Sequence, residues 1–155
     1  MITAQSKTNQ RGFTLIELLV VIGILAVLLA ITLIAINPAR QFSQANNTQR
    51  RSDVNSLLSA VNQYMADNNG QVPAEITTTG QSISISGADL CNVLVPQYIA
   101  ALPVDPTGTQ SGAITSANCV SAYDTGYQIS QSATNSRITV SATNAELGET
   151  ITVTR

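Results

Sequence analysis

The chain has 155 residues, of which 44% are hydrophobic and only 10% are charged, and its formal net charge is −2. It contains no histidine, which removes the usual general base of a serine or cysteine triad and the commonest metal ligand. Lys7 is the single lysine, and no glycine-rich phosphate-binding pattern occurs. We therefore do not expect an enzyme, a metal or another cofactor, and the length allows one modest domain with an appendage.

Two segments begin the chain. Residues 1–12 are polar, carry Lys7 and Arg11 without an acid, and are typical of a leader or a cytoplasmic tail. Residues 13–36 are apolar apart from Thr14, Glu17, Gly23 and Thr32, and as a helix they would span about 36 Å, enough to cross a bilayer. The run is too long for an ordinary secretory signal, and no A-x-A triplet follows it. A domain this small could hardly bury such a helix all round, so the sequence predicts a membrane span.

The charges around this run do not decide its orientation, because Lys7 and Arg11 precede it and Arg40, Arg50 and Arg51 follow it. The Ser/Thr-rich remainder and its pair of cysteines favour export of the C-terminal part. In an exported domain a disulfide between Cys91 and Cys119 is expected, and two buried free thiols are the alternative. Closing that loop would stabilise the fold by about 3–4 kcal/mol in the chain-entropy model.

Residues 37–69 are predicted to form an amphipathic helix that continues from the apolar run. Pro38 kinks or breaks the helix, or else Asn37 is an N-cap and Pro38 the first position of a new helix. Asp53 is expected on the polar, solvated face, and Gly70 is suited to a left-handed position that ends the helix. An apolar stripe, begun weakly by Phe42, has helical spacing at Val54, Leu57, Leu58, Val61, Tyr64 and Met65.

Residues 70–155 are predicted to be an exported globular head. Residues 81–86 alternate like a strand, and 88–95 could be a short helix stopped by Pro96. Strand candidates at 126–133, 136–142 and 149–155 are joined by short links, which favours an antiparallel meander. The expected class is α+β, with a long helix whose second half packs on a small antiparallel sheet.

The stretch from Arg11 to Leu18, read Arg-Gly-Phe-Thr-Leu-Ile-Glu-Leu, resembles the N-terminal processing motif of type IV pilins and pseudopilins. The resemblance implies a pilin-like lollipop fold and cleavage between Gly12 and Phe13 by a membrane-bound prepilin peptidase. It also implies N-methylation of Phe13. The precursor would wait in the inner membrane among lipids. An inner-membrane platform and an assembly ATPase would then build a helical homo-oligomeric filament outside the cytoplasm.

An acid inside an apolar run is costly unless a cation meets it, which gives Glu17 a role under this resemblance. Cleavage after Gly12 creates such a cation, the ammonium of Phe13. Glu17 of one subunit would pair with this amine on its neighbour and so set the register of the filament. An interfacial carboxylate that reaches the lipid headgroups is the alternative.

The sequence of the head says less about function than the N-terminal motif does. Leu102-Pro103-Val104-Asp105-Pro106 is similar to a stretch of the major pseudopilins of type II secretion systems, but Thr107-Gly108 stands where those proteins usually have Trp-Gly. Two ordinary turns would explain the same residues. The calcium ligands found in some pseudopilins cannot be mapped onto this sequence, so no metal site is assigned.

The first reading is a subunit of a type IV pilus-like filament. The alternative is a major pseudopilin of a type II secretion system. A single-pass membrane protein with a small exported binding domain is a third candidate, which the sequence supports less well. Direct nucleic-acid binding is not expected, because eight acids and two arginines lie from Asp53 onward.

Overall fold

The computed structural model describes residues 12–155. The predicted leader therefore lies outside the described residues, except for Gly12. The chain divides into two compact units, of which the first ends at Ala39 and the second runs from Arg40 to Arg155.

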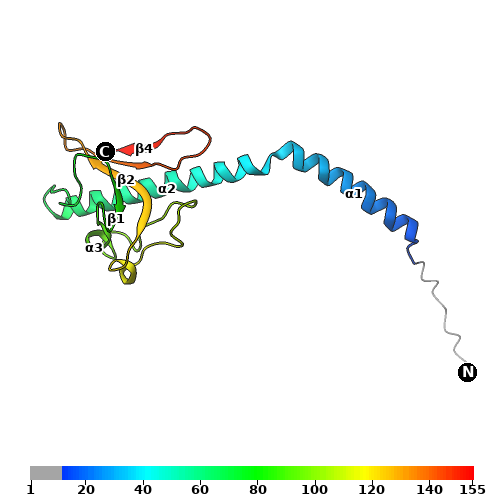
Figure 1. Ribbon diagram of the computed structural model, residues 1–155, viewed down its shortest axis with the longest axis horizontal. Coiled ribbons are helices and arrows are strands. Elements are labelled where there is room, and N and C mark those ends of the chain that lie inside the picture. Colours follow the sequence, from blue (N-terminus) through cyan, green and yellow to red (C-terminus); the bar gives the residue numbers. More distant parts are fainter. Residues whose placement is uncertain (1–11) are drawn as a thin grey trace, which may run out of the picture. The chain divides into compact units, whose positions relative to one another are not determined.

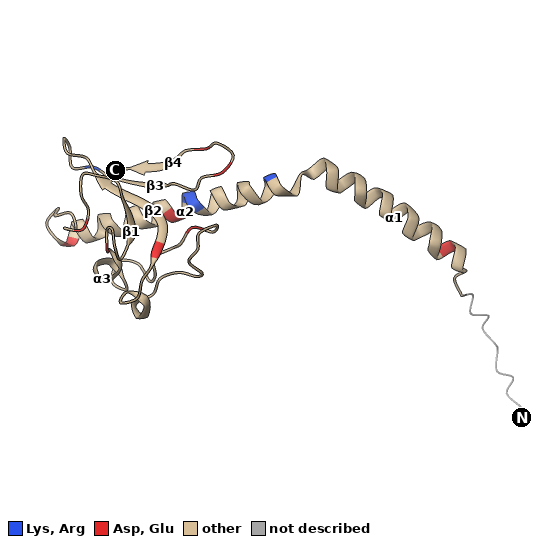
Figure 2. Cartoon of the chain, in the orientation of Figure 1, with Lys and Arg blue, Asp and Glu red and all other residues tan. Residues whose placement is uncertain are grey.

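The helix α1, Leu15–Ile36, forms most of the first unit. It is apolar all round and none of its residues is buried, so its sequence gives it no preferred face for a core. Figure 2 shows one acidic residue at its start and no further charge along it. Within residues 12–155 it is the one helix long and apolar enough to cross a membrane.

Asn37 and Pro38 separate this helix from the next. Asn37 has φ 46° and ψ 76°, a left-handed conformation that ends α1 and that asparagine adopts more readily than most residues. The helix α2, Pro38–Asp67, begins at the proline itself. Proline suits a first helical position because its missing N–H would have no intrahelical partner there. The structure thus has a new helix starting at Pro38, with Asn37 closing the helix before it.

In the second unit α2 lies along a four-stranded sheet (Figure 1). The strands are β1, Gln81–Ser84; β2, Asp124–Gln131; β3, Ile138–Ala142; and β4, Ile151–Thr154. They lie in the order β1-β2-β3-β4, and every neighbouring pair is antiparallel. The predicted α+β fold, a long helix packed on a small antiparallel sheet, is confirmed.

The core of the head lies between α2 and one face of this sheet. β3 alternates buried and half-buried residues along its length, as a strand with one covered face should. Phe42 takes no part in this core, because its side chain is 71% exposed. The stripe on α2 therefore begins later than predicted, and its fully packed members are Val54, Leu57, Leu58 and Val61.

Two short helices complete the head. The helix α3, Cys91–Leu94, and the 3-10 helix η1, Ser116–Asn118, lie on the long connection between β1 and β2. Cys91 and Cys119 are joined by a disulfide, and both are buried. Leu102 and Ile114 exchange two backbone hydrogen bonds of 2.8 Å inside the loop that the disulfide closes. The connection is therefore fastened at two points.

Candidate functional site

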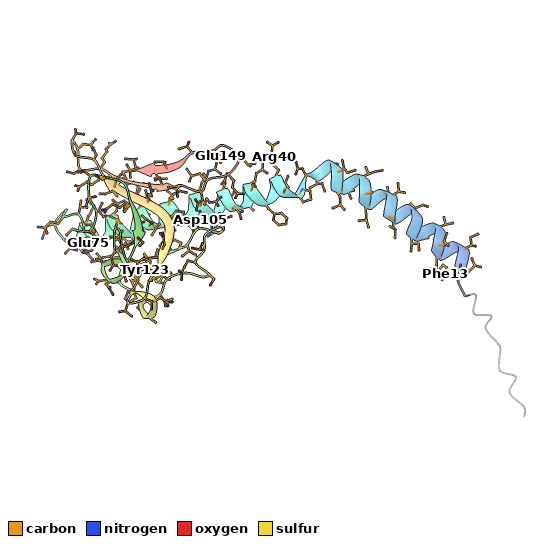
Figure 3. All side chains as sticks on the ribbon, viewed as in Figure 1. Phe13, Arg40, Glu75, Asp105, Tyr123 and Glu149 are labelled. Carbon is orange, nitrogen blue, oxygen red and sulfur yellow. A yellow bond between two sulfur atoms is a disulfide. The ribbon has the colours of Figure 1, made fainter. Side chains whose placement is uncertain are left out.

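The N-terminal residues singled out from the sequence lie together at the start of α1. Phe13 is 85% exposed and begins the described side chains in Figure 3. Thr14 is the N-cap of α1 and forms a capping box with Glu17. The Glu17 amide donates to Thr14 Oγ1 at 3.3 Å, while the Thr14 amide and hydroxyl donate to Glu17 Oε2 at 2.8 and 2.7 Å.

The capping box gives Glu17 a structural role that was not predicted from the sequence. The signature of a capping box, Thr-x-x-Glu before an apolar run, is nevertheless present there. It fixes the carboxylate in the first turn, where the positive end of the helix dipole favours a negative charge. A carboxylate has about four acceptor positions. The two donors from Thr14 therefore leave room for a further cation on Glu17.

A second polar site lies inside the head, around the guanidinium of Arg50. This side chain is fully buried, yet each of its five N–H groups has an acceptor. Nε and Nη2 donate to the two carboxylate oxygens of Asp105 at 2.8 and 3.0 Å, and Nη2 also donates to Thr107 Oγ1 at 2.6 Å. Nη1 donates to Asn47 Oδ1 at 3.0 Å and to Glu146 Oε2 at 2.9 Å. We call these five residues the Arg50 network.

The Arg50 network fastens two loops to α2. Asp105, labelled beside α2 in Figure 3, comes from the connection between β1 and β2. It lies close to β2, since its amide donates to Thr125 O at 2.8 Å. A Cβ on Gly126, whose φ is +76°, would lie 2.8 Å from the Asp105 Cβ. Gly126 is therefore needed both for its backbone conformation and for this close approach.

The prediction that Asp53 lies on the solvated face of α2 is wrong. Its side chain is buried and accepts hydrogen bonds from Tyr127 Oη at 2.7 Å and from Gln49 Nε2 at 2.8 Å. The strand β2 supplies the tyrosine, so a contact across 74 residues decides the burial of Asp53. Burial raises the pKa of the Asp53 carboxyl even though both neighbours donate to it.

The helical spacing does carry one signal for the Arg50 network. Arg50 precedes Val54 by four residues and Leu57 by seven, so it belongs to the apolar stripe and not to the solvated face. A charged residue at such a position predicts a buried partner. The partner itself could not be read from α2, because Asp105 lies 55 residues away.

Two comparisons with known proteins bear on the N-terminal site and on the chain as a whole. Residues 7–33 match the prokaryotic N-terminal methylation motif. The chain is 38% identical over 109 residues to the type II secretion system core protein G of Pectobacterium carotovorum subsp. carotovorum, a match that covers 68% of this chain and 67% of the relative. The chain belongs to the type IV pilin and pseudopilin family. No solved structure gives a significant match to it.

Family membership makes the chain a pilin or pseudopilin subunit, a structural protein and not an enzyme. Its N-terminal hydrophobic helix with the prepilin motif is consistent with a precursor in the inner membrane. Asp105, from the stretch that resembles major pseudopilins, and Thr107, just after it, both join the Arg50 network. Thr107 stands where that resemblance expects a tryptophan, and its hydroxyl both accepts from Arg50 and donates to Asp105.

The pKa values of the two acids follow from the Arg50 network. Burial alone would raise the pKa of the Asp105 carboxyl, but hydrogen bonds from Arg50 and Thr107 outweigh it and hold that pKa below its ordinary value of 3.8. Hydrogen bonds from Arg50, then Asn46 and Ser43, lower the pKa of Glu146 below 4.5. Both acids are therefore ionised in the folded pilin-family subunit at neutral pH.

Replacing Arg50 with methionine is expected to lower the unfolding free energy of the head by about 3–5 kcal/mol, because Asp105 would remain buried without its counter-charge. Arg51→Met is the matched control, since Arg51 pairs with Glu149 on an exposed surface and such pairs contribute about 0–1 kcal/mol. The measurement is urea denaturation of the full chain in detergent, followed by circular dichroism. Equal losses in the two variants would contradict the central role of Arg50.

The head is expected to lose stability as the pH falls from about 5 towards 3. The folded-state pKa values of Asp105 and Glu146 are depressed, so their contribution is present above the ordinary values of 3.8 and 4.5 and is lost on acidification through the folded values. Asp53 has a raised pKa and acts in the opposite direction. Glu146→Gln should flatten the fall in the urea midpoint between pH 5 and 3. A fall as steep as that of the unchanged chain would show that Glu146 does not contribute.

Proposed function

We propose that this chain is the filament subunit of a type II secretion system, a major pseudopilin. The observation that carries this proposal is the 38% identity to a type II secretion system core protein G over two thirds of each chain. Asp105 supports it, since the stretch that resembles major pseudopilins fastens the head to α2. A subunit of a type IV pilus-like filament, the first reading from the sequence, has the same N-terminal motif, so the motif alone does not separate the two. A single-pass protein with an exported binding domain would not account for the methylation motif.

The N-terminal segments then act in order. Prepilin peptidase removes the leader, residues 1–12, by cutting between Gly12 and Phe13, and the new amine of Phe13 is methylated. Residues 13–36 hold the subunit in the inner membrane until a platform and an ATPase move it into a filament outside the cytoplasm. Residues 37–69 carry the head, residues 70–155, to the outside of that filament.

Glu17 is the assembly residue in this proposal. Its carboxylate stands in the first turn of α1, five residues into the cleaved chain, and its position is fixed by Thr14. In a filament it meets the Phe13 ammonium of a neighbouring subunit. Two apolar helices can slide along each other at little cost, whereas a buried carboxylate must find its one cation. The charge pair therefore sets the register, and the apolar surface of α1 supplies most of the adhesion.

Glu17→Gln removes the charge and keeps the cap, because glutamine also serves in capping boxes. We expect this variant to be processed and inserted normally but to form few or no filaments. Mass spectrometry should find it, like the unchanged chain, beginning at Phe13 with one added methyl group. Filaments are then counted by electron microscopy after subunit overproduction. Thr14→Ala is the control, since it weakens the cap and keeps the charge. Normal filaments from Glu17→Gln would remove the charge pairing from the proposal.

Deleting the gene is expected to leave the substrates of the secretion system inside the periplasm, while surface pili and twitching movement persist. Activity of a secreted enzyme in the medium and in the periplasm measures the first effect, and colony spreading measures the second. Re-expression of the unchanged chain should restore export. Loss of spreading with normal export would instead support the pilus-like filament.

A further inference from the structure

The connection between β3 and β4 contains a tight turn with an unexpected residue. The Glu149 amide donates to the Glu146 carbonyl at 3.1 Å, which closes a four-residue turn. Its two central residues, Leu147 and Gly148, have φ values of 59° and 69°. Positive φ at both central positions is the pattern of a type I′ turn, which favours asparagine, aspartate or glycine.

Gly148 suits this turn, but Leu147 does not. A leucine in the left-handed region brings its Cβ too close to the backbone, and such strain persists only where the surroundings impose it. Burial of the side chain does not offset this strain, since Leu147 remains 49% exposed. An asparagine at this position would relieve the strain and would not expose an apolar side chain.

The turn is nevertheless held firmly. Glu146, next to the leucine, accepts hydrogen bonds from Ser43 Oγ and Asn46 Nδ2, each at 2.9 Å, in addition to the bond from Arg50. Asn47 bonds both backbone groups of Glu146, donating to its carbonyl at 2.9 Å and accepting from its amide at 3.0 Å. The leucine is therefore presented at a fixed place beside the first turns of α2.

A second exposed apolar side chain lies next to these anchors. Phe42 precedes Ser43 and stands one turn before Asn46, and both of those residues bind Glu146. It is also only six residues past Ile36, the last residue of α1. The apolar helix α1 is thus followed, within a few residues, by the part of α2 that binds Glu146. In the proposed filament, packing of α1 against other copies would bring those copies close to this neighbouring segment.

We propose that Leu147 is a contact for a second copy of this chain in the filament. The strain of the turn and the exposure of the leucine are retained because the neighbouring subunit covers the side chain. This inference rests on the proposed filament function. It adds a contact in the head to the pairing of Glu17 at the other end of the filament helix.

The test is Leu147→Asn in the full chain, which keeps the turn and removes the apolar contact. We expect the melting temperature of the detergent-solubilised subunit to stay the same or rise, and the filament yield to fall roughly tenfold, the factor expected for losing one buried leucine contact. Leu147→Met should assemble almost normally. Val120→Asn is the matched control, because Val120 is 83% exposed on a different loop, and it should not change the yield.

Contrary results have distinct meanings. An unchanged filament yield for Leu147→Asn would overturn the contact, and so would a fall in its melting temperature, because the leucine would then serve the subunit's own fold. A photo-crosslinking amino acid at position 147 should join two copies in assembled filaments. Cross-links only to a different protein would overturn the choice of partner. Failure of the unchanged chain to form filaments would overturn the proposed function, and the contact with it.

Discussion

Two connections in the head, the one between β1 and β2 and the one between β3 and β4, depend on one buried cation. Arg50 is cut off from water and must find an acceptor for each N–H group inside the protein, because an unsatisfied buried charge costs several kcal/mol. Asp105 and Thr107 supply three of those acceptors from one loop, and Glu146 supplies one from another. The apolar stripe on α2 favours packing against a sheet, but it does not choose between nearby positions of the loops. The fixed fork of the guanidinium does choose, because its N–H groups require acceptors at set positions.

The parts that could be predicted are those that repeat along the chain. The apolar run of α1, the stripe from Val54 to Val61 and the alternation in β3 all have a period set by local geometry, so they are visible without the fold. Asp53 and Phe42 were misplaced for the opposite reason. Helical spacing put Asp53 on the solvated face and Phe42 at the start of the apolar stripe. The hydrogen bond from Tyr127 buries Asp53, whereas Phe42 is left exposed. Glu146 gave no local signal at all, since its partners lie about 100 residues earlier.

Glu17 shows how one carboxylate can serve two states of the same chain. Within the subunit it caps α1 through Thr14, which satisfies donors that would otherwise face lipid or the filament core without a partner. Between subunits it is proposed to receive the Phe13 ammonium. The cap holds the acid in the first turn in advance, so little side-chain freedom remains to be lost on pairing. The sequence contains the signature of each role. The processing motif accounts for Glu17 so specifically that the capping box with Thr14 was overlooked.

The junction at Asn37 and Pro38 has a mechanical consequence. Pro38 has no N–H to give to the carbonyl of Ile34, and the left-handed Asn37 interrupts the helical path on its other side. Helices melt cooperatively because each turn supports the next through such bonds, and Pro38 cannot supply one at this junction. We expect a pull along the chain that unravels part of α1 to stop at Asn37, so that α2 and the head stay folded. The junction would then limit how far unfolding spreads, so that a filament could lengthen under load while the heads on its outer surface keep their structure.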